Sequence, residues 1–199
     1  MSSLLVGADV DAALEADEAW LEIPYDIVTV IARDDEGAAY LARRVGTADH
    51  VVLKIIGPRE DAAAIVSRAR LWRPQLSQLH DSHVARLLDA GPAADGCIYI
   101  AADYIAGPTL ASVSCRGSLT QDGRRAVVDQ LAGALAGLHA RGIAHLKLDA
   151  SRVKITDRDG VHATLIGLGT GLIVDGLGCE PVLDREALQS LARQLGVGA

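Results

Sequence analysis

The stretch from Leu135 to Val153 reads LAGLHARGIAHLKLDASRV and changes character halfway along. Its first residues complete a series of apolar positions, three or four residues apart, formed by Val127, Leu131, Leu135 and Leu138. This spacing is typical of one face of an α-helix. After Gly142 the helical period is lost, and charged side chains are interspersed with apolar ones. The stretch therefore predicts a long helix that ends near this glycine and leads into a polar loop.

The rest of the C-terminal half continues this pattern. Thr120 can cap the start of the long helix. Two apolar runs, 153–155 and 163–166, flank the turn sequence DRDG and predict a hairpin. A last helix is predicted over 184–195, with Asp184 as its N-cap. Three apolar residues fall on one face of that helix: Leu188, Leu191 and Leu195.

The N-terminal half is rich in short β-type runs. They lie at 27–31, 38–41, 51–56, 85–88 and 97–104. Helical spacing covers 58 to 79 and is interrupted by Pro74. The pair Gly107-Pro108 then marks a boundary. We therefore expect an α+β chain in three parts: an extension over 1–24 with a short helix within 9–22, a five-stranded antiparallel lobe over 25–106, and a helical lobe over 107–199.

Composition excludes several classes of function. The 199 residues carry a formal charge of −7, which opposes binding to nucleic acid. The cysteines, Cys97, Cys115 and Cys179, are too far apart for a zinc-binding pattern or a disulfide framework. The N-terminus lacks the basic region and long apolar run of a signal peptide, and no run reaches the length of a membrane span. We expect a cytoplasmic chain without a bound metal or a membrane span.

Four segments in order resemble a bacterial-type serine/threonine protein kinase over residues 25 to 196. VVLKII at 51–56 is similar to the strand that carries the phosphate-contacting lysine, which places Lys54 in that role. HVARLLDAG at 83–91 resembles the strand after the regulatory helix. IYIAADYIAGPTL at 98–110 looks like the hinge, with Ala102 as gatekeeper. The quoted stretch at 135–153 resembles the catalytic loop and the helix before it. The resemblance implies a two-lobed fold with a shortened C-terminal lobe.

The residues that carry kinase chemistry differ in this chain. The resemblance places Lys147 where the catalytic aspartate stands and Arg152 where an asparagine holds metal. Gly167 falls on the metal-binding aspartate of the Asp-Phe-Gly motif. A lysine cannot accept a proton as a carboxylate does, and an arginine cannot bind magnesium. The glutamate of the regulatory helix falls near Leu71, and one glycine remains of the three in the phosphate-covering loop.

These substitutions predict a catalytically inactive pseudokinase, not an enzyme, that acts as a regulatory or scaffolding module. One alternative is a metal-independent nucleotide- or anion-binding switch, whose site combines Lys54, Ala102, Asp103, Lys147 and Arg152. A second alternative is an atypical phosphotransferase, which needs a carboxylate near the cleft from Asp149 or Asp103. Lys147 and Arg152 can instead pair with Asp149 or point into solvent. No cofactor is expected in the leading interpretation, and ATP is the nucleotide considered.

The expected partner is a protein, such as a kinase or a phosphopeptide reader. About fifteen residues separate Gly169 from Asp184, so the substrate-docking part of a kinase is expected to be missing. On this view Leu188, Leu191 and Leu195 leave an apolar patch that supports self-association, unless their helix packs inward.

Overall fold

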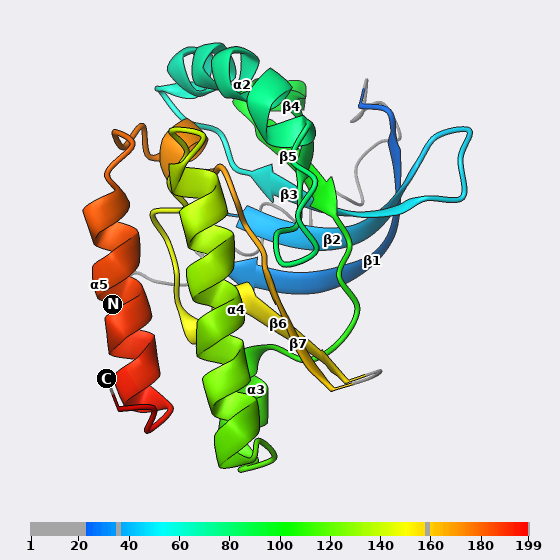
Figure 1. Cartoon of the computed structure of the whole chain (residues 1–199). Helices are drawn as coiled ribbons and strands as arrows, with labels where there is room; N and C mark the ends of the chain where they lie inside the picture. Colours follow the sequence, from blue (N-terminus) through cyan, green and yellow to red (C-terminus); the bar gives the residue numbers. More distant parts are fainter. Residues whose placement is uncertain (1–22, 35–36, 158–159, 199) are drawn as a thin grey trace, which may run out of the picture. The chain divides into compact units, whose positions relative to one another are not determined.

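The computed structural model describes residues 23–34, 37–157 and 160–198 (Figure 1). The expected helix within 9–22 lies outside these ranges. The chain forms two compact units. Unit 1 is Met1–Arg73 with Leu88–Tyr104, and unit 2 is Pro74–Leu87 with Ile105–Ala199.

Unit 1 is built on a five-stranded sheet in the order β1-β2-β3-β5-β4. Its strands are β1 (Tyr25–Asp34), β2 (Gly37–Arg44), β3 (His50–Ile56), β4 (Leu87–Pro92) and β5 (Ile98–Asp103). The first three form an antiparallel meander, and β5 pairs antiparallel with β3. The short turns between successive runs permit this arrangement. The predicted antiparallel five-stranded sheet is confirmed.

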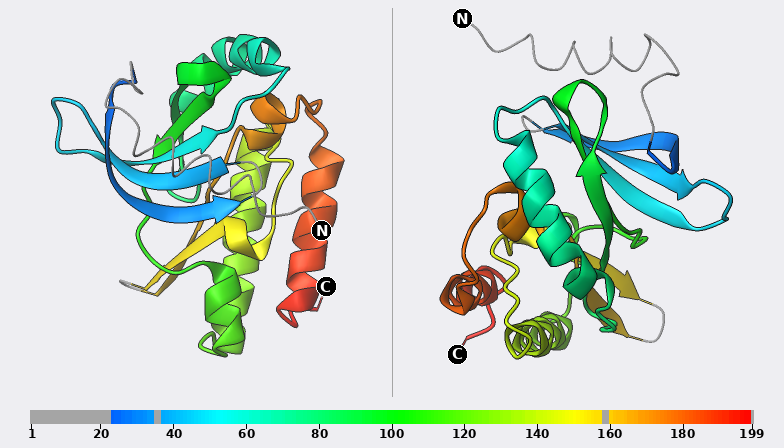
Figure 2. Two further views of the ribbon diagram at one scale, coloured as in Figure 1. Left: turned by 180° about the vertical axis from the view of Figure 1, so that it is seen from behind. Right: turned by 90° about the horizontal axis from the view of Figure 1, so that it is seen from above.

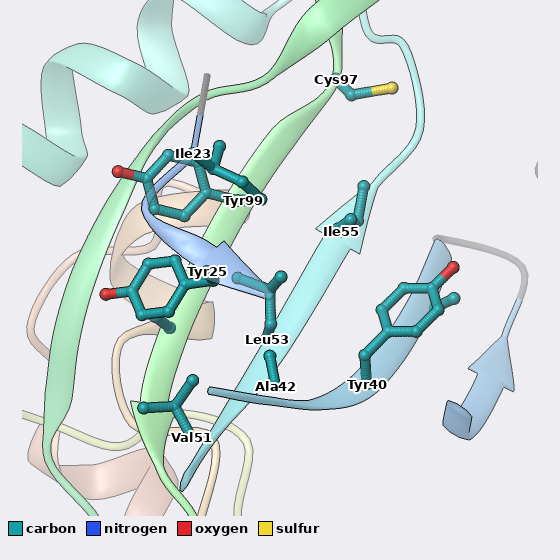
Figure 3. Packing of buried hydrophobic residues seen from close by; sticks show 11 residues of the cluster. Ile23, Tyr25, Tyr40, Ala42, Val51, Leu53, Ile55, Cys97 and Tyr99 are labelled. Carbon is teal, nitrogen blue, oxygen red and sulfur yellow. The ribbon is translucent and has the colours of Figure 1, made fainter. Parts of the chain in front are cut away.

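One face of this sheet carries an aliphatic and tyrosine core (Figure 3). Leu53 and Tyr40 face each other across β2 and β3 and are almost completely buried. Tyr25 and Tyr99 lie with their ring centroids 6.1 Å apart. The Tyr99 hydroxyl donates to Asp89 Oδ2 at 3.0 Å, and burial is the main cause that raises the pKa of this phenol. The tyrosines thus fill volume that phenylalanine occupies in many other cores.

Helix α2 (Ala62–Ser77) follows β3 and contains Pro74 in its interior. We expected the helical spacing to be interrupted at this proline, but the helix continues for three more residues. A proline inside a helix removes one backbone donor and does not always end the helix. Ile65 and Leu76 are completely buried, whereas Leu71 is 65% exposed.

The described residues of unit 2 include three α-helices and a hairpin. They are α3 (Leu110–Cys115), α4 (Gln121–His139), α5 (Pro181–Gln194) and the pair β6 (Val153–Asp157) and β7 (Val161–Leu165). The predicted cap of α4 is confirmed, because Thr120 Oγ1 accepts the backbone N–H of Gly123 at 3.1 Å. Helices α4 and α5 lie side by side (Figures 1 and 2). Gln130 joins α4 to β7 by bonding to the backbone of Val161 and Ala163.

Two expectations about the end of the chain are wrong. Asp184 is not an N-cap: α5 begins at Pro181, and Asp184 lies in its first turn with a completely buried side chain. Leu191 and Leu195 are only 3% and 5% exposed, so they do not form an open apolar patch. Leu188 is half-buried. The helix packs inward, as the alternative interpretation held.

The strand expected at 85–88 is displaced along the chain. Strand β4 begins at Leu87, while the preceding residues pair with the hairpin of unit 2. The backbone N–H of Ala85 donates to Leu165 O, and the N–H of Leu165 donates to His83 O, both at 2.8 Å. The apolar run therefore pairs with two different sheets, β7 through residues 83–85 and the five-stranded sheet from Leu87 onward. A local apolar pattern does not reveal which sheet each residue joins.

Candidate functional site

The candidate site of unit 2 is organised by the carboxylate of Asp184. Its Oδ2 accepts the backbone N–H of His145 at 2.8 Å, and its Oδ1 accepts that of Leu146 at 2.6 Å. The ring Nε2 of His139, at the end of α4, lies 2.9 Å from Oδ2. A buried carboxylate is stable only with such partners. Asp184 therefore ties α4 and α5 to the loop that follows Ile143.

The loop adopts a strained conformation at Leu146, whose φ is +67°. A branched side chain seldom occupies this left-handed region. The N–H of Leu146 donates to Asp184, and this hydrogen bond helps to hold the strained residue in place. The next residue, Lys147, is fixed in direction as a result.

His145 is a buried structural histidine. Its Nε2 donates to the backbone oxygen of Ile166 at 3.0 Å. Among the described residues none provides a hydrogen-bond partner for its Nδ1. Burial lowers the pKa of the imidazole, so the ring is neutral at physiological pH. His145 therefore has a structural role in the core of unit 2.

Lys147 forms an ion pair with a carboxylate from a different segment. Its Nζ lies 2.8 Å from Asp175 Oδ2, and the two side chains are 27% and 25% exposed. Asp175 follows the short turn η4 (Thr170–Val174), all of whose residues are buried. That turn lies directly on the loop, because a Cβ on Gly171 would stand 2.7 Å from the Cβ of Leu146. The fold thus brings a carboxylate to the loop position that lacks one.

Arg152 occupies the space beside Gly167. A Cβ on Gly167 would lie 2.6 Å from Arg152 Nη1, so the guanidinium stands where a side chain on residue 167 would project. The backbone at Gly167 has a φ of +81°. Arg152 Nε also lies 3.9 Å from Asp149 Oδ2, a carboxylate that is 57% exposed. The changes at positions 152 and 167 are therefore coupled in space.

Magnesium does not fit these two positions. Gly167 offers no side-chain oxygen, and the guanidinium of Arg152 places a fixed positive charge beside it. Magnesium requires oxygen ligands from carboxylates, water and phosphates. In the described ranges no group of three or more acidic, histidine or cysteine side chains could hold a metal ion. The donor set here suits an anion better than a cation.

The remaining expected site residues belong to unit 1. Lys54 pairs with Ile100 across β3 and β5, and Ala102 pairs with Val52. Because side chains alternate along a strand, Lys54 and Ala102 lie on one face of the sheet and Asp103 on the other. The structure therefore brings together Lys54 and Ala102 within unit 1, and separately gathers the loop residues of unit 2.

Two residues that organise this site were not predicted from the sequence. Asp175 gave no signal in its own segment, and the pattern around Asp184 predicted only a helix cap. The available signal for Asp184 was Pro181, because proline is favoured in the first turn of a helix and would have placed the helix start before Asp184. No local signal connects Asp175 to Lys147, because 27 residues separate them.

The known proteins that this chain resembles in sequence are serine/threonine-protein kinases. The chain is 26% identical over 167 residues to serine/threonine-protein kinase pkn3 of Myxococcus xanthus, covering 81% of this chain and 30% of that protein. It is 27% identical over 157 residues to PknD of Mycobacterium tuberculosis, covering 77% of this chain and 23% of that protein. It is 33% identical over 152 residues to the probable serine/threonine-protein kinase PkwA of Thermomonospora curvata, covering 75% of this chain and 20% of that protein. The chain thus spans less than a third of these relatives. No family model matches it.

Solved structures agree with this class. The kinase domain of PknI from Mycobacterium tuberculosis, as a mutant, superposes with a TM-score of 0.71 at 25% identity. The match covers 86% of this chain and 72% of that one. Within the described ranges, no helix of this chain is both long and apolar enough to cross a membrane.

The expectation that the chain is not an enzyme is wrong. Its relatives are named serine/threonine protein kinases and its structural neighbours are kinase domains, which points to a kinase. The expectation rested on the residues aligned with the base and the metal ligands, and its only further candidate carboxylates were Asp149 and Asp103. It could not include a carboxylate such as Asp175, which tertiary structure brings to Lys147. The chain has the α+β fold of a protein kinase domain and is related to bacterial serine/threonine protein kinases.

Proposed function

We propose that this chain is a kinase-fold domain that binds a nucleoside triphosphate without a divalent metal. The observation that carries the proposal is the guanidinium of Arg152 beside Gly167. A guanidinium is always charged, and its planar set of donors matches the oxygens of a phosphate group. In the related kinases a metal ion neutralises the phosphates. Arg152 supplies positive charge at the corresponding place.

The present partner of Arg152 leaves this charge available. Asp149 lies 3.9 Å from Arg152 Nε, and its carboxylate is more than half exposed. The other oxygen of Asp149 already accepts the backbone N–H of Ser151 at 2.6 Å. Exposed ion pairs contribute about 0–1 kcal/mol, so a phosphate group can compete for the guanidinium. Lys147 is held more closely by Asp175, and we therefore assign the phosphate contact to Arg152.

Calorimetric titration with ATP tests the proposal. We expect binding in EDTA that is no weaker than binding with magnesium, because the site uses a resident cation. Arg152→Gln should weaken the affinity by about tenfold or more, corresponding to the loss of one charge-assisted contact of about 1.5–3 kcal/mol. Arg185→Gln, at an exposed position on α5, is the matched control and should leave the affinity unchanged.

Two results would reject metal-free binding. One is the absence of heat at millimolar ATP in EDTA. The other is binding that appears only with magnesium and is equal in Arg152→Gln and wild type.

We also propose a regulatory or scaffolding role through a protein partner in the cytoplasm, where ATP is available. Three large apolar side chains near the start of α5 support this role: Leu177, Val182 and Leu183 are 42%, 44% and 38% exposed. A contiguous exposed apolar patch is typical of a binding surface, and we expect Val182 and Leu183, which are adjacent in the chain, to contribute to one. Self-association through this segment is one form of the same role.

Light scattering and partner recovery test the regulatory role. The double change Val182→Ser with Leu183→Ser should reduce association with itself or with a recovered protein. Leu71→Ser, at a 65% exposed position on α2, is the control and should not. A monomer at high concentration that recovers the same proteins in all variants contradicts the role of this surface.

A further inference from the structure

The loop position that the resemblance assigns to a catalytic carboxylate holds Lys147, yet a carboxylate is present beside it. Asp175 Oδ2 lies 2.8 Å from Lys147 Nζ. The Asp175 side chain is 25% exposed, so solvent and a small reacting group can reach it. The carboxylate reaches the site from the segment after η4 and not from the loop itself.

We infer that Asp175 is the general base for phosphate transfer to a hydroxyl group, and that Lys147 is its positioning residue. The inference rests on the proposed function, since the phosphate donor must first be bound. It adds an activity and a catalytic residue to that function.

Both members of the pair are held by backbone contacts that fix their positions. On the side of Asp175, its N–H donates to Thr170 O at 3.3 Å, and the N–H of Leu177 donates to Gly171 O at 3.0 Å. On the side of Lys147, the preceding Leu146 is held by Asp184. The close approach of Gly171 to Leu146 joins the two segments. Such preorganisation is what a catalytic base requires.

Other carboxylates of unit 2 are less suitable. Asp184 is completely buried and accepts the N–H groups of His145 and Leu146, so it cannot reach a substrate. Asp149 bonds to Ser151 through Oδ1 and lies near Arg152 through Oδ2. Both oxygens of Asp149 therefore contact residues of its own turn, and we assign this carboxylate to stabilising that turn. Asp175 combines access with a fixed direction.

The reaction is a transfer of the terminal phosphoryl group. The acceptor oxygen forms a bond to the γ-phosphorus, and the bond from that phosphorus to the oxygen bridging to the β-phosphate breaks. The hydroxyl proton passes to Asp175 and later to water. The products are a phosphate ester and a nucleoside diphosphate. Such reactions depend mainly on positioning and charge neutralisation. The base therefore needs to be a carboxylate that is held in a fixed position, and Lys147 holds Asp175 in this way.

Phosphate transfer from radiolabelled ATP to a degenerate serine and threonine peptide mixture tests the inference, in EDTA and in magnesium. We expect Asp175→Asn to lower the initial rate by about 10²–10⁴-fold, the usual contribution of a general base. The exposed control Glu186→Gln should stay within about threefold of wild type. Lys147→Ala should lower the rate by less than Asp175→Asn does, because the carboxylate remains but loses the cation that holds it in position.

A charge exchange provides a test of rescue. Asp175→Lys alone should abolish transfer, whereas Asp175→Lys combined with Lys147→Asp returns a carboxylate to the loop and should recover much of the rate. If the ion pair is only structural, the double exchange should restore the free energy of unfolding, but the transfer rate should not depend on where the carboxylate stands.

ATP affinity, measured on the same variants, separates the two proposals. Binding in EDTA without phosphate transfer in wild type overturns the role of Asp175 and leaves the proposed function standing. Equal transfer rates in wild type and Asp175→Asn also overturn it. Absence of ATP binding rejects the proposed function, and the inference about Asp175 with it.

Discussion

Arg152 and Gly167 share one volume: Nη1 of the arginine lies 2.6 Å from the point where a Cβ on residue 167 would stand. The resemblance to protein kinases assigns these two positions to metal-binding residues. The arginine fits because its neighbour has no side chain, and the glycine leaves no cavity because the arginine fills the space. We therefore expect the residues at positions 152 and 167 to depend on each other, since a side chain at one excludes the guanidinium of the other.

The coupling predicts a non-additive effect on stability. Gly167→Ala should lower the free energy of unfolding by about 2–4 kcal/mol, from the cost of φ near +81° and from overlap with the guanidinium. In an Arg152→Ala background the same change should cost only about 1–2 kcal/mol, because the overlap is gone. Urea denaturation of the four variants measures both values. Gly142→Ala is the control: its φ is +69°, and nothing lies within 4 Å of the added Cβ. Equal costs of Gly167→Ala in both backgrounds would contradict the coupling.

Asp184 is predicted to be the most sensitive polar residue of unit 2. Asp184→Asn replaces one of the two oxygens that accept the N–H groups of His145 and Leu146 by an NH2 donor, so one of these buried N–H groups faces another donor. We expect a loss of about 3–5 kcal/mol in the free energy of unfolding, the usual cost of breaking a buried charged network. Glu186→Gln, an exposed residue on the same helix, should change it by less than about 0.5 kcal/mol. Urea or thermal denaturation of both variants checks this, and a loss below about 1 kcal/mol for Asp184→Asn would count against it.

The buried His145 predicts a dependence of stability on pH. Burial lowers the pKa of the folded imidazole below its ordinary value of 6.5, whereas the nearby Asp184 and Asp149 oppose this shift and Arg152 adds to it. Below about pH 6.5 the unfolded chain therefore binds more protons than the folded chain at this residue. Stability should fall as pH decreases, with a slope of up to about 1.4 kcal/mol per pH unit from this group.

His145→Gln keeps an N–H donor toward Ile166 O and does not titrate. The slope between pH 6.5 and pH 5 should therefore be smaller in His145→Gln than in wild type. His80→Gln, at an exposed histidine, serves as the control and should retain the wild-type slope. Identical slopes in all three proteins would show that His145 is not responsible.

The cap of α4 predicts a local effect. Thr120→Ala removes the oxygen that accepts the N–H of Gly123 and should lower the free energy of unfolding by about 1 kcal/mol. Ser118→Ala, at an exposed position just before the helix, should have little effect. Thermal denaturation of the two variants gives the comparison, and amide exchange at the first turn of α4 should rise only in Thr120→Ala.

Periodic segments of the sequence predicted much of the fold. The apolar spacing through Leu131 and Leu138 indicated α4, and the runs on either side of the DRDG turn indicated the hairpin of β6 and β7. The order of short strands predicted the five-stranded sheet. These elements depend on which residues of a single segment face the core, and that information is local.

What the sequence by itself determined was the kinase fold, and its resemblance to kinases pointed to Lys147, Arg152 and Gly167 as candidate site residues. Only the tertiary structure decided what those residues contact. Asp175 reaches Lys147 and Arg152 fills the space of Gly167 because folding brings separate segments within a few ångströms. Asp184 became the centre of a buried network for the same reason. Side-chain proximity across the chain is set by packing, whereas a local pattern reports only the character of each segment.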